Sequence, residues 1–343
     1  MSLARAIETG DVTLLPSRRD EDWRWTDLRG LIRQIPPRAP AGHAWGPGFF
    51  SQVVADRHVG IVNGRGPDKL VVDGGGIIEL RFVNDGAGTA SSILSLRVDG
   101  EGDAVLLETY EGSDDASVAS VALTIDIAAG AALERVVICE SAAEAVLVSQ
   151  ATVRLAPGAR FRQTILTSGA RRQRLETQVT HLGGGAHCRL DGVYVNADQR
   201  HSDITTVVIH AGVGGTTDQL IKGVVSDQAR AVFQGRIVVE HGADKTDARM
   251  GHHALILSDR AEVDAKPELL IYADDVACAH GNTVGALDED ALFYALQRGI
   301  PQDQAKAMLT QAFVAEVVDR IDHEGARDVA RAWVADRLGG SDV

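Results

Sequence analysis

The segment at 68–278 most constrains the fold, because it contains many short runs with strand propensity and no helical repeat. Some runs alternate apolar with small or polar residues, as at 121–127. Others are denser in β-branched residues, as at 205–209 and 236–239. Glycine, alanine, aspartate and asparagine separate these runs. The pattern predicts a core made of strands without an intervening amphipathic helix.

A weak repeat runs through the same segment. Turns made of small residues precede new strands, and their central glycines, Gly130, Gly158 and Gly185, are spaced by 28 and then 27 residues. Repeats of about 20 to 50 residues with one turn type are typical of stacked coils, so we predict a β-solenoid. A β-sandwich whose turns are rich in glycine and alanine gives the same pattern, and the residues alone leave both architectures open.

The two ends of the chain differ from this core. The N-terminal part begins with helix-compatible sequence, and Ser17 or Asp20 can cap a helix over 20–35. A cluster of prolines ends that helix, and residues 43–48 are interpreted as a loop. The first part of the chain is therefore expected to be helical and to stop before the strands.

The C-terminal part has a helical period again. Asp288 can cap a first helix that runs through Gln297, and two more helices follow, the last ending near the glycines at 339 and 340. The apolar residues expected to face inward on the first of these helices are Leu292, Phe293 and Leu296. The predicted division is an N-terminal helical region at 1–67, a β-core at 68–284 and a C-terminal helical domain at 285–343.

The net charge of the chain limits the classes of binding partner that it can have. The chain has 48 acidic and 34 basic residues and a net charge of −14, and such a surface repels phosphate backbones and anionic lipid. We therefore expect no nucleic acid and no membrane as partners. The one compact basic run, Arg171, Arg172 and Arg174, is interpreted as a solvated turn. No membrane-length apolar run and no secretory signal is found, so a cytoplasmic location is expected.

The three cysteines, Cys139, Cys188 and Cys278, lie far apart and form no C-x-x-C pair. An odd number of isolated cysteines argues against a disulfide framework and for a reducing compartment. A cluster held by cysteines alone needs four thiolates. This chain therefore cannot hold a ferredoxin-like cluster by itself, and any cluster that it binds must be shared.

The sharpest candidate site is the tripeptide Cys278-Ala279-His280. On an extended strand, residues i and i+2 point to the same face, so the thiol and the imidazole can both contact one bound metal ion or ligand. Thiolate and imidazole suit iron or zinc. Two ligands do not complete a site, and a packed cysteine beside a hydrogen-bonded histidine is the alternative interpretation. Asp274 and Asp275 either cap the turn before this strand or orient His280 from behind.

Other chemical signatures are weak or missing. His252 and His253 are adjacent, so on a strand they face opposite ways and form a poor chelating pair, with at least one of them at the surface. Neither a G-x-S-x-G elbow nor a phosphate-binding G-x-x-x-x-G-K-[ST] loop is present, so we expect no ATP hydrolysis by this chain. The glycine run at 74–76 lacks the strand–helix context of a dinucleotide site.

From Lys245 onward the sequence resembles the SufD family, which carries motifs such as K-T-D-A-R, P-E-L-x-I-Y-A-D-D-V-x-C and L-D-E-x-A-L-F-Y. A second match lies near the start, at 16–21 and 23–28. Motifs at both ends in the expected order are more specific than any short motif. The later matches are 245–249, 257–259, 267–269, 271–276, Cys278, 280–281, Thr283, 287–289, 291–294 and 298–301.

The chain also departs from the SufD pattern. Alanine stands at 279 where the family often has serine, Trp25 replaces a usual tyrosine, and Asn282 stands where alanine is frequent. His252 and His253 fall where asparagine is common. None of these differences removes Cys278 or His280. They therefore bear on the fine properties of the candidate site and not on the presence of its two main residues.

The resemblance implies a right-handed parallel β-helix between helical N-terminal and C-terminal regions. It implies a scaffold subunit, not an enzyme, in a SUF iron–sulfur cluster assembly complex. One end of the β-helix would pair with a SufB-like paralogue, or with a second copy when the chain is alone. The C-terminal helices would bind a SufC-like ABC ATPase. The candidate residues for docking that ATPase are Leu292, Phe293, Tyr294, Arg298, Ile300 and Pro301.

By the same resemblance, His280 is the ligand expected to face a cysteine of the SufB-like partner, with Cys278, Asp274 and Asp275 in support. The iron–sulfur cluster would be transient and shared, and none would be tightly bound by this chain alone. Two alternatives stay open. One is a polysaccharide-active β-helix, which needs calcium or paired carboxylates. The other is a passive solenoid module in which Cys278 and His280 belong to the core.

Overall fold

The computed structural model describes residues 2–42, 46–113 and 116–339 of the chain. Residues 46–48 lie in a loop, as predicted. The remainder of that predicted loop, 43–45 with His43 and Trp45, lies outside the described residues, as does the glycine at 340. No helix within the described ranges is long and apolar enough to cross a membrane.

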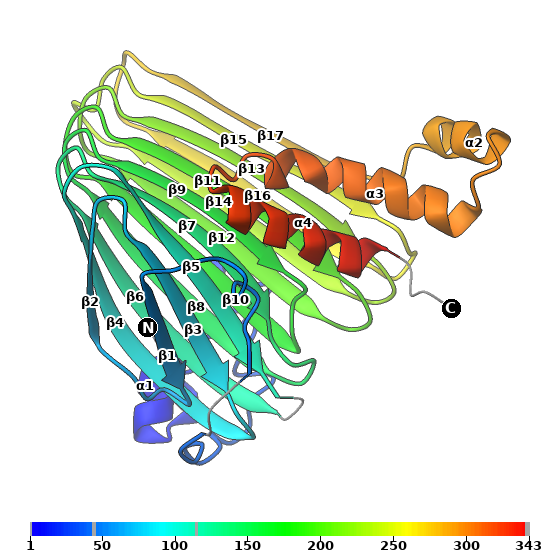
Figure 1. Ribbon diagram of the computed structural model, residues 1–343, viewed down its shortest axis with the longest axis horizontal. Coiled ribbons are helices and arrows are strands. Elements are labelled where there is room, and N and C mark those ends of the chain that lie inside the picture. Colours follow the sequence, from blue (N-terminus) through cyan, green and yellow to red (C-terminus); the bar gives the residue numbers. More distant parts are fainter. Residues whose placement is uncertain (1, 43–45, 114–115, 340–343) are drawn as a thin grey trace.

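Two parallel sheets lie face to face and share one chain that winds between them, so the core is a β-solenoid (Figure 1). The odd-strand sheet contains β1 (Arg57–Val62), β3 (Ile77–Asn84), β5 (Asp103–Gly112), β7 (Ala132–Glu140), β9 (Arg160–Thr167), β11 (His187–Asn196), β13 (Thr216–Val225), β15 (Asp247–Ile256) and β17 (Ala277–Gly285). The even-strand sheet contains β2 (Lys69–Asp73), β4 (Gly88–Asp99), β6 (Ser117–Ile127), β8 (Val146–Leu155), β10 (Arg172–His181), β12 (His201–His210), β14 (Arg230–Val239) and β16 (Glu262–Ile271). Consecutive strands alternate between the sheets, which confirms the solenoid prediction and excludes the sandwich.

The glycine repeat forms one corner of the solenoid. Gly130, Gly158 and Gly185 have φ angles of 71°, 67° and 67°, which only glycine adopts without strain. The amide of Gly130 donates to the carbonyl of Pro157, and the amide of Gly158 donates to that of Gly184. The same turn is therefore stacked on itself, coil upon coil, which is why the repeat is visible in the sequence.

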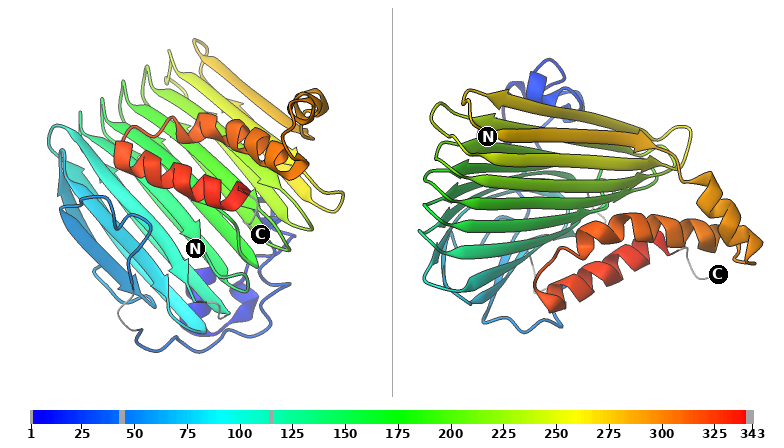
Figure 2. Two further views of the ribbon diagram at one scale, coloured as in Figure 1. Left: turned by 45° about the vertical axis from the view of Figure 1, so that its right-hand side comes forward. Right: turned by 90° about the horizontal axis from the view of Figure 1, so that it is seen from above.

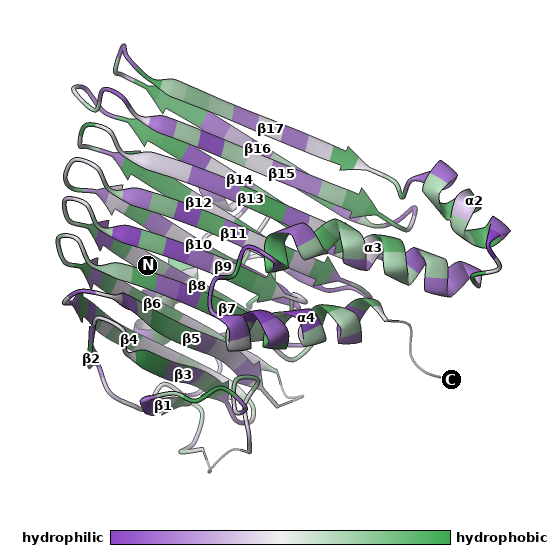
Figure 3. Ribbon diagram, turned by 45° about the horizontal axis from the view of Figure 1, so that its top comes forward, coloured by the Kyte–Doolittle hydropathy of each residue, from purple (hydrophilic) through white to green (hydrophobic). Residues whose placement is uncertain are grey.

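The core lies between the two sheets and is built by alternation along each strand (Figure 3). Because the strands are parallel and in register, equivalent residues stack from coil to coil. One such column consists of Ile125, Val153, Val179, Val208 and Ile237, all fully buried. Each fully buried aliphatic side chain contributes about 1.5–3 kcal/mol. The stacked columns supply the apolar burial that holds the coils together.

The terminal regions cover the outer faces of the sheets (Figure 2). The helices α3 (Gln302–Val318) and α4 (Glu324–Leu338) pack on the odd-strand sheet, where Val317 and Trp333 belong to the same buried apolar cluster as Val193. Helix α1 (Ser2–Thr9) and the segment that follows it cover the even-strand sheet. Two short 3-10 turns, η1 (Val12–Leu14) and η2 (Glu21–Trp23), belong to that segment.

Three expectations need correction. The helix predicted over 20–35 is wrong, because only η2 forms there and the rest of the segment lies on the sheet, with Leu28 and Ile32 buried. Helix α2 (Glu289–Gln297) begins after Asp288 as predicted, but none of its residues is buried, so its apolar side chains do not face inward. The first strand begins at Arg57, ahead of the boundary at 68.

Candidate functional site

The strand that carries Cys278 and His280 is the last of its sheet. Within the described ranges, β17 pairs with β15 alone, and β16 pairs with β14 alone. These two strands form the final coil, and we call them the open end of the solenoid. The open end lies beside helix α2 and far from β1 and β2 (Figure 1). Among the described residues, no further coil covers this end of the solenoid.

Cys278 and His280 face the space between the two sheets. Their register partners on β15, Ala248 and Met250, are buried in the core. Residues in register on adjacent parallel strands lie on the same face of the sheet, so Cys278 and His280 lie on the core-facing side of β17. Side chains two residues apart on one strand face lie about 7 Å from each other. The thiol and the imidazole therefore share one face, as predicted, and their binding of one common group stays a prediction.

The two side chains differ in environment. Cys278 is half-buried and packs against the core, and this burial raises the pKa of its thiol above the ordinary value. His280 is exposed, because no coil within the described ranges follows β17 and covers it. A protonated thiol is a poor metal ligand. At the open end, His280 is thus the more accessible of the two side chains and Cys278 the more buried one.

The open end also has the properties of a pairing surface. Strands β16 and β17 contain 10 and 9 residues, whereas the strands at the opposite end, β1 and β2, contain 6 and 5. Long unpaired edges are templates for a strand of another chain, and short ones are protected. Leu270, Ile271, Tyr272 and Val284 are each at least 40% exposed here. The edges and these apolar side chains together suit association with a second protein.

Asp274 and Asp275 lie in the turn between β16 and β17, and both are exposed. The backbone carbonyl of Asp275 accepts a hydrogen bond from the amide of Lys245, which joins this turn to the coil below. Within the described part of the chain, neither carboxylate makes a hydrogen bond or an ion pair with His280. Their position in the turn agrees with a role in capping it, and the role of orienting the His280 side chain stays a prediction.

The predicted docking residues lie on a part of the chain that stands away from the solenoid (Figure 2). On α2, Phe293 is 62% and Tyr294 is 61% exposed. The Arg298 guanidinium lies 4.9 Å from the centre of the Tyr294 ring and donates a 2.7 Å hydrogen bond to its hydroxyl. Leu292 and Ile300 are half-buried, and Pro301 is exposed at the start of α3.

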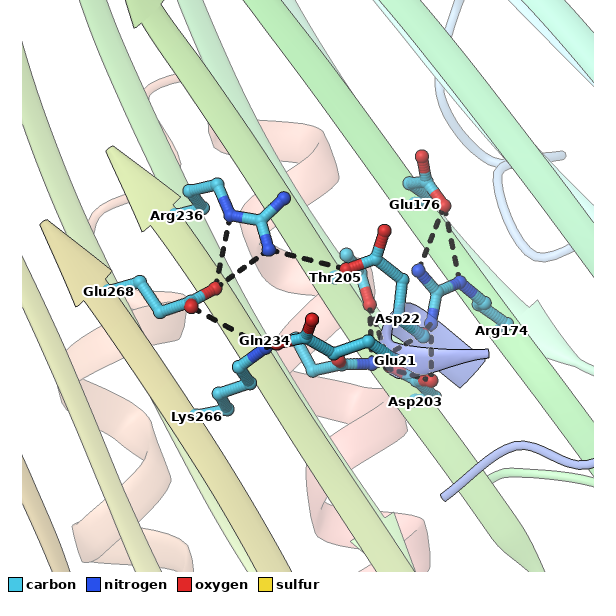
Figure 4. Close-up of polar contacts among 10 residues, drawn as sticks. All are labelled: Glu21, Asp22, Arg174, Glu176, Asp203, Thr205, Gln234, Arg236, Lys266 and Glu268. Atoms are coloured by element: carbon cyan, nitrogen blue, oxygen red, sulfur yellow. Dashed lines mark hydrogen bonds and ion pairs between the residues drawn. The ribbon is translucent and has the colours of Figure 1, made fainter. Parts of the chain in front are cut away.

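A buried ion pair fastens the N-terminal segment to the even-strand sheet (Figure 4). Arg174 Nη1 lies 2.9 Å from Asp203 Oδ2, and the two side chains are 2% and 0% exposed. Thr26 Oγ1 donates to the same carboxylate oxygen, and the Trp23 ring lies 4.5 Å from the guanidinium. The interpretation of the basic run as a solvated turn is therefore wrong for Arg174, which sits on β10 beneath the N-terminal segment.

The same network continues toward the open end. Arg236 on β14 binds Glu268 on β16 and also Asp22 of the N-terminal segment, while Lys266 on β16 binds Glu21 at 2.7 Å. A polar cavity of about 210 Å³ lies within this network. The N-terminal segment is thus tied to the edge strand of the open end, a link that the sequence pattern did not predict.

The histidines fall into two groups. His252 is fully buried and His253 is half-buried, which confirms that they face opposite sides of β15. His181 and His210 appeared scattered in the sequence, but their rings lie 4.1 Å apart in the core because β10 and β12 are neighbours in register. Among the described residues, no group of three or more His, Cys, Asp or Glu side chains could hold a metal ion.

Residues 82–313 match the family described as SUF system FeS cluster assembly, SufBD core domain. The chain belongs to the SufBD family. It is 38% identical over 181 residues to the iron–sulfur cluster assembly protein SufD of Escherichia coli, an alignment that covers 52% of this chain and 42% of that protein. It is 36% identical over 152 residues to SufD of Bacillus subtilis, covering 44% of this chain and 35% of that one.

A SufBD family protein of Mycobacterium bovis is 26% identical over 364 residues, covering 96% of this chain and 90% of that protein. The chain matches less than half the length of the two SufD relatives. These relatives carry names that describe iron–sulfur cluster assembly, and the family match confirms the SufD resemblance of the motifs. The polysaccharide-active alternative gains no support from them.

Proposed function

We propose that this SufBD-family chain is a SufD-type subunit of a cytoplasmic SUF complex that assembles iron–sulfur clusters. It acts as a non-catalytic scaffold partner of a SufB-like protein and a SufC-like ABC ATPase. The observation that carries this proposal is the exposed His280 on the last coil, between two long unpaired strand edges. Membership in the SufBD family supports a role in iron–sulfur cluster assembly, and the exposure of the open end supports a shared site there.

The junction with the SufB-like partner forms at the open end. Backbone groups on the outer edges of β16 and β17 pair with strands of the partner, as edge strands do when another chain is available. Cys278 and His280 offer at most two ligands, whereas iron in such clusters is held by four protein ligands per cluster. The partner therefore supplies the remaining thiolates, and the cluster is a transient cargo that both chains hold.

The ATPase binds the exposed surface of α2 through Phe293, Tyr294 and Arg298, with Leu292, Ile300 and Pro301 at its border. Only residues 286–288 separate β17 from α2. A connection this short transmits a displacement of α2 to the strand that carries His280. When ATP draws two bound ATPases together, the strain reaches the junction and exposes the assembly site.

In the absence of a SufB-like partner, two copies of this chain pair through the same surface. The apolar side chains and strand edges of the open end are then buried against their own copies. A twofold arrangement places both His280 side chains at one contact, without the partner's thiolates. The homodimer thus lacks the thiolates that a cluster of the shared kind needs.

Complementation tests the ligand role. In cells that lack their own copy of this subunit, the wild-type chain restores cluster-dependent enzyme activity, and we expect His280→Ala to fail. His253→Ala is the matched control, because His253 lies on the neighbouring strand, faces the other side of the sheet and bonds to Thr283. Normal cluster assembly with His280→Ala would remove the ligand role. If the Cys278→Ala/His280→Ala double variant also assembles clusters normally while it still binds the ATPase, the chain is a passive solenoid module.

A further inference from the structure

A buried chain of hydrogen bonds runs through the core and ends at the open end. Tyr194 on β11 is fully buried, and its ring lies over Gly223 on β13, where a Cβ atom would come within 1.8 Å of it. Because Gly223 has no side chain, the tyrosine reaches past β13 to His252 on β15. The Tyr194 hydroxyl lies 2.9 Å from His252 Nε2, and the imidazole is stacked on Phe233 with centroids 4.8 Å apart.

The next link leads from His252 to the last strand. His252 Nδ1 lies 2.6 Å from Oδ1 of Asn282 on β17. Burial lowers the pKa of His252 to about 4, so the ring is neutral near pH 7 and carries one proton. A carboxamide oxygen only accepts hydrogen bonds, so the proton is on Nδ1. His252 Nε2 then accepts from the Tyr194 hydroxyl, and every group in the chain has one defined role.

This arrangement fixes the orientation of Asn282. Its amide is planar, and its oxygen is held toward the core by His252, so its NH2 group is turned away from His252. Asn282 is exposed and lies two residues after His280 on the same face of β17. The two side chains are therefore about 7 Å apart. The NH2 group is within reach of a ligand bound at His280.

We propose that Asn282 is a positioning residue of the shared site, which donates N–H hydrogen bonds to a sulfide or thiolate sulfur of the cluster bound at His280. Tyr194 and His252 hold its amide in the donating orientation. This inference rests on the proposed function, because it needs a cluster at His280. Hydrogen bonds to the sulfurs are among the factors that set the stability and potential of such clusters, and residues behind the ligands commonly provide them.

The first test needs no cluster. In the full chain labelled with ¹⁵N-histidine, the shifts of the His252 ring nitrogens report which one carries the proton, and His252→Asn assigns the signals. We expect the proton on Nδ1. In Tyr194→Phe the hydroxyl donor is lost, so the ring shifts toward the Nε2–H form and Asn282 turns its oxygen outward. An Nε2–H ring in the wild type would overturn the proposal.

Tyr110→Phe is the matched control for Tyr194→Phe. Tyr110 is also fully buried in the core, and its hydroxyl lies 2.6 Å from Ser149 Oγ. Both substitutions remove a buried tyrosine hydrogen bond, but Tyr110 has no contact with His252 or Asn282 within the described residues. We expect Tyr110→Phe to leave the His252 signals unchanged. A stability loss alone therefore cannot imitate the effect of Tyr194→Phe.

The second test measures how fast the complex with the SufB-like partner releases iron to a chelator. We expect about ten- to hundredfold faster release in Asn282→Ala and in Tyr194→Phe, the size expected for one hydrogen bond to a charged acceptor, and no change in Tyr110→Phe. Wild-type release rates in Asn282→Ala and Tyr194→Phe, with no cluster at all in His280→Ala, would reject the inference and keep the proposed function. Full cluster loading in His280→Ala would instead reject the proposed function.

Discussion

His252 on β15 and Asn282 on β17 are joined by a 2.6 Å contact between Nδ1 and Oδ1. Both residues are places where the sequence departs from the SufD motifs, with a histidine at a position where asparagine is common and an asparagine where alanine is frequent. In the sequence they are separate differences, 30 residues apart. In the structure they form one unit, because β15 and β17 are adjacent and in register.

A double-mutant cycle tests whether the two residues depend on each other. His252→Asn and Asn282→Ala each break the hydrogen bond, so each lowers the free energy of unfolding. The double variant loses the same bond only once. We expect a coupling free energy of about 0.5–1.5 kcal/mol, measured by urea unfolding of the four proteins. Additive effects of the two substitutions would contradict the dependence.

The ion pair between Arg174 and Asp203 should be important for the N-terminal segment. Arg174→Met keeps the side-chain volume but leaves the fully buried Asp203 carboxylate without its cation. Breaking a buried pair in this way costs about 3–5 kcal/mol. We expect a loss of stability in this range in urea unfolding, together with faster tryptic cleavage at the exposed Arg18, Arg19 and Arg24.

Lys266→Met is the control for that experiment. Lys266 also binds the N-terminal segment, through Glu21, but Glu21 is 78% exposed at the side chain. Exposed pairs contribute about 0–1 kcal/mol, so stability and cleavage should change little. Equal effects of the two substitutions would show that the burial of Arg174 is not what holds the segment.

Much of the fold could be predicted from the sequence, because each coil of the solenoid has a similar length and the same kind of turn, so turn residues recur at nearly constant spacing. Gly130, Gly158 and Gly185 occupy one corner on successive coils, and strand alternation identifies the core-facing residues. The capping residue Asp288 also predicted the start of α2, since its carboxylate accepts from the amides of Asp290 and Ala291. Turns and helix caps depend on residues that are close together in the chain, so they can be recognised in the sequence.

Long-range contacts could not be predicted. The segment after Asp20 has apolar residues at helical spacing, yet Trp23, Thr26 and Leu28 each contact the sheet, and these contacts replace a helix. Arg174 looked like part of a solvated basic run because its partner, Asp203, lies on the next coil of the solenoid. Similarly, the roles of His252 and Asn282 depend on the register of β15 with β17, which no motif encodes.

The buried histidines should make the protein sensitive to acid. Burial lowers the pKa of His181 to about 3, with His210 and His187 nearby adding to the effect, and burial lowers that of His210 to about 4. In the unfolded chain both titrate near 6.5. Protonation therefore favours the unfolded state, so stability is full above about pH 6.5 and falls as the pH drops toward 4.

The double variant His181→Leu/His210→Leu checks this explanation. Its free energy of unfolding in urea should fall less steeply between pH 6.5 and 4.5 than that of the wild type, since each unit of pKa difference corresponds to about 1.4 kcal/mol. His187→Leu replaces an exposed histidine next to the pair and should keep most of the wild-type slope. Identical slopes in all three proteins would exclude the core pair as the source.

The exposed face of α2 should be important for binding and not for folding. Phe293→Ala removes a side chain that is 62% exposed, so the free energy of unfolding should change by less than about 0.5 kcal/mol while the SufC-like ATPase no longer co-purifies. Val317→Ala, in the buried face of α3, should cost roughly 2 kcal/mol and keep the ATPase. Retention of the ATPase by Phe293→Ala would move the docking surface elsewhere.

The decisive measurement is pulsed electron paramagnetic resonance on the reduced cluster in the complex with the SufB-like partner. With His280 as a ligand, the spectrum contains a ¹⁴N coupling from a directly bound imidazole; that coupling is kept in His253→Ala and is lost in His280→Ala, whether that variant holds no cluster or only a residual one. An unchanged nitrogen coupling in a cluster-loaded His280→Ala complex would contradict the proposal that the open end supplies an imidazole to a cluster held by two chains.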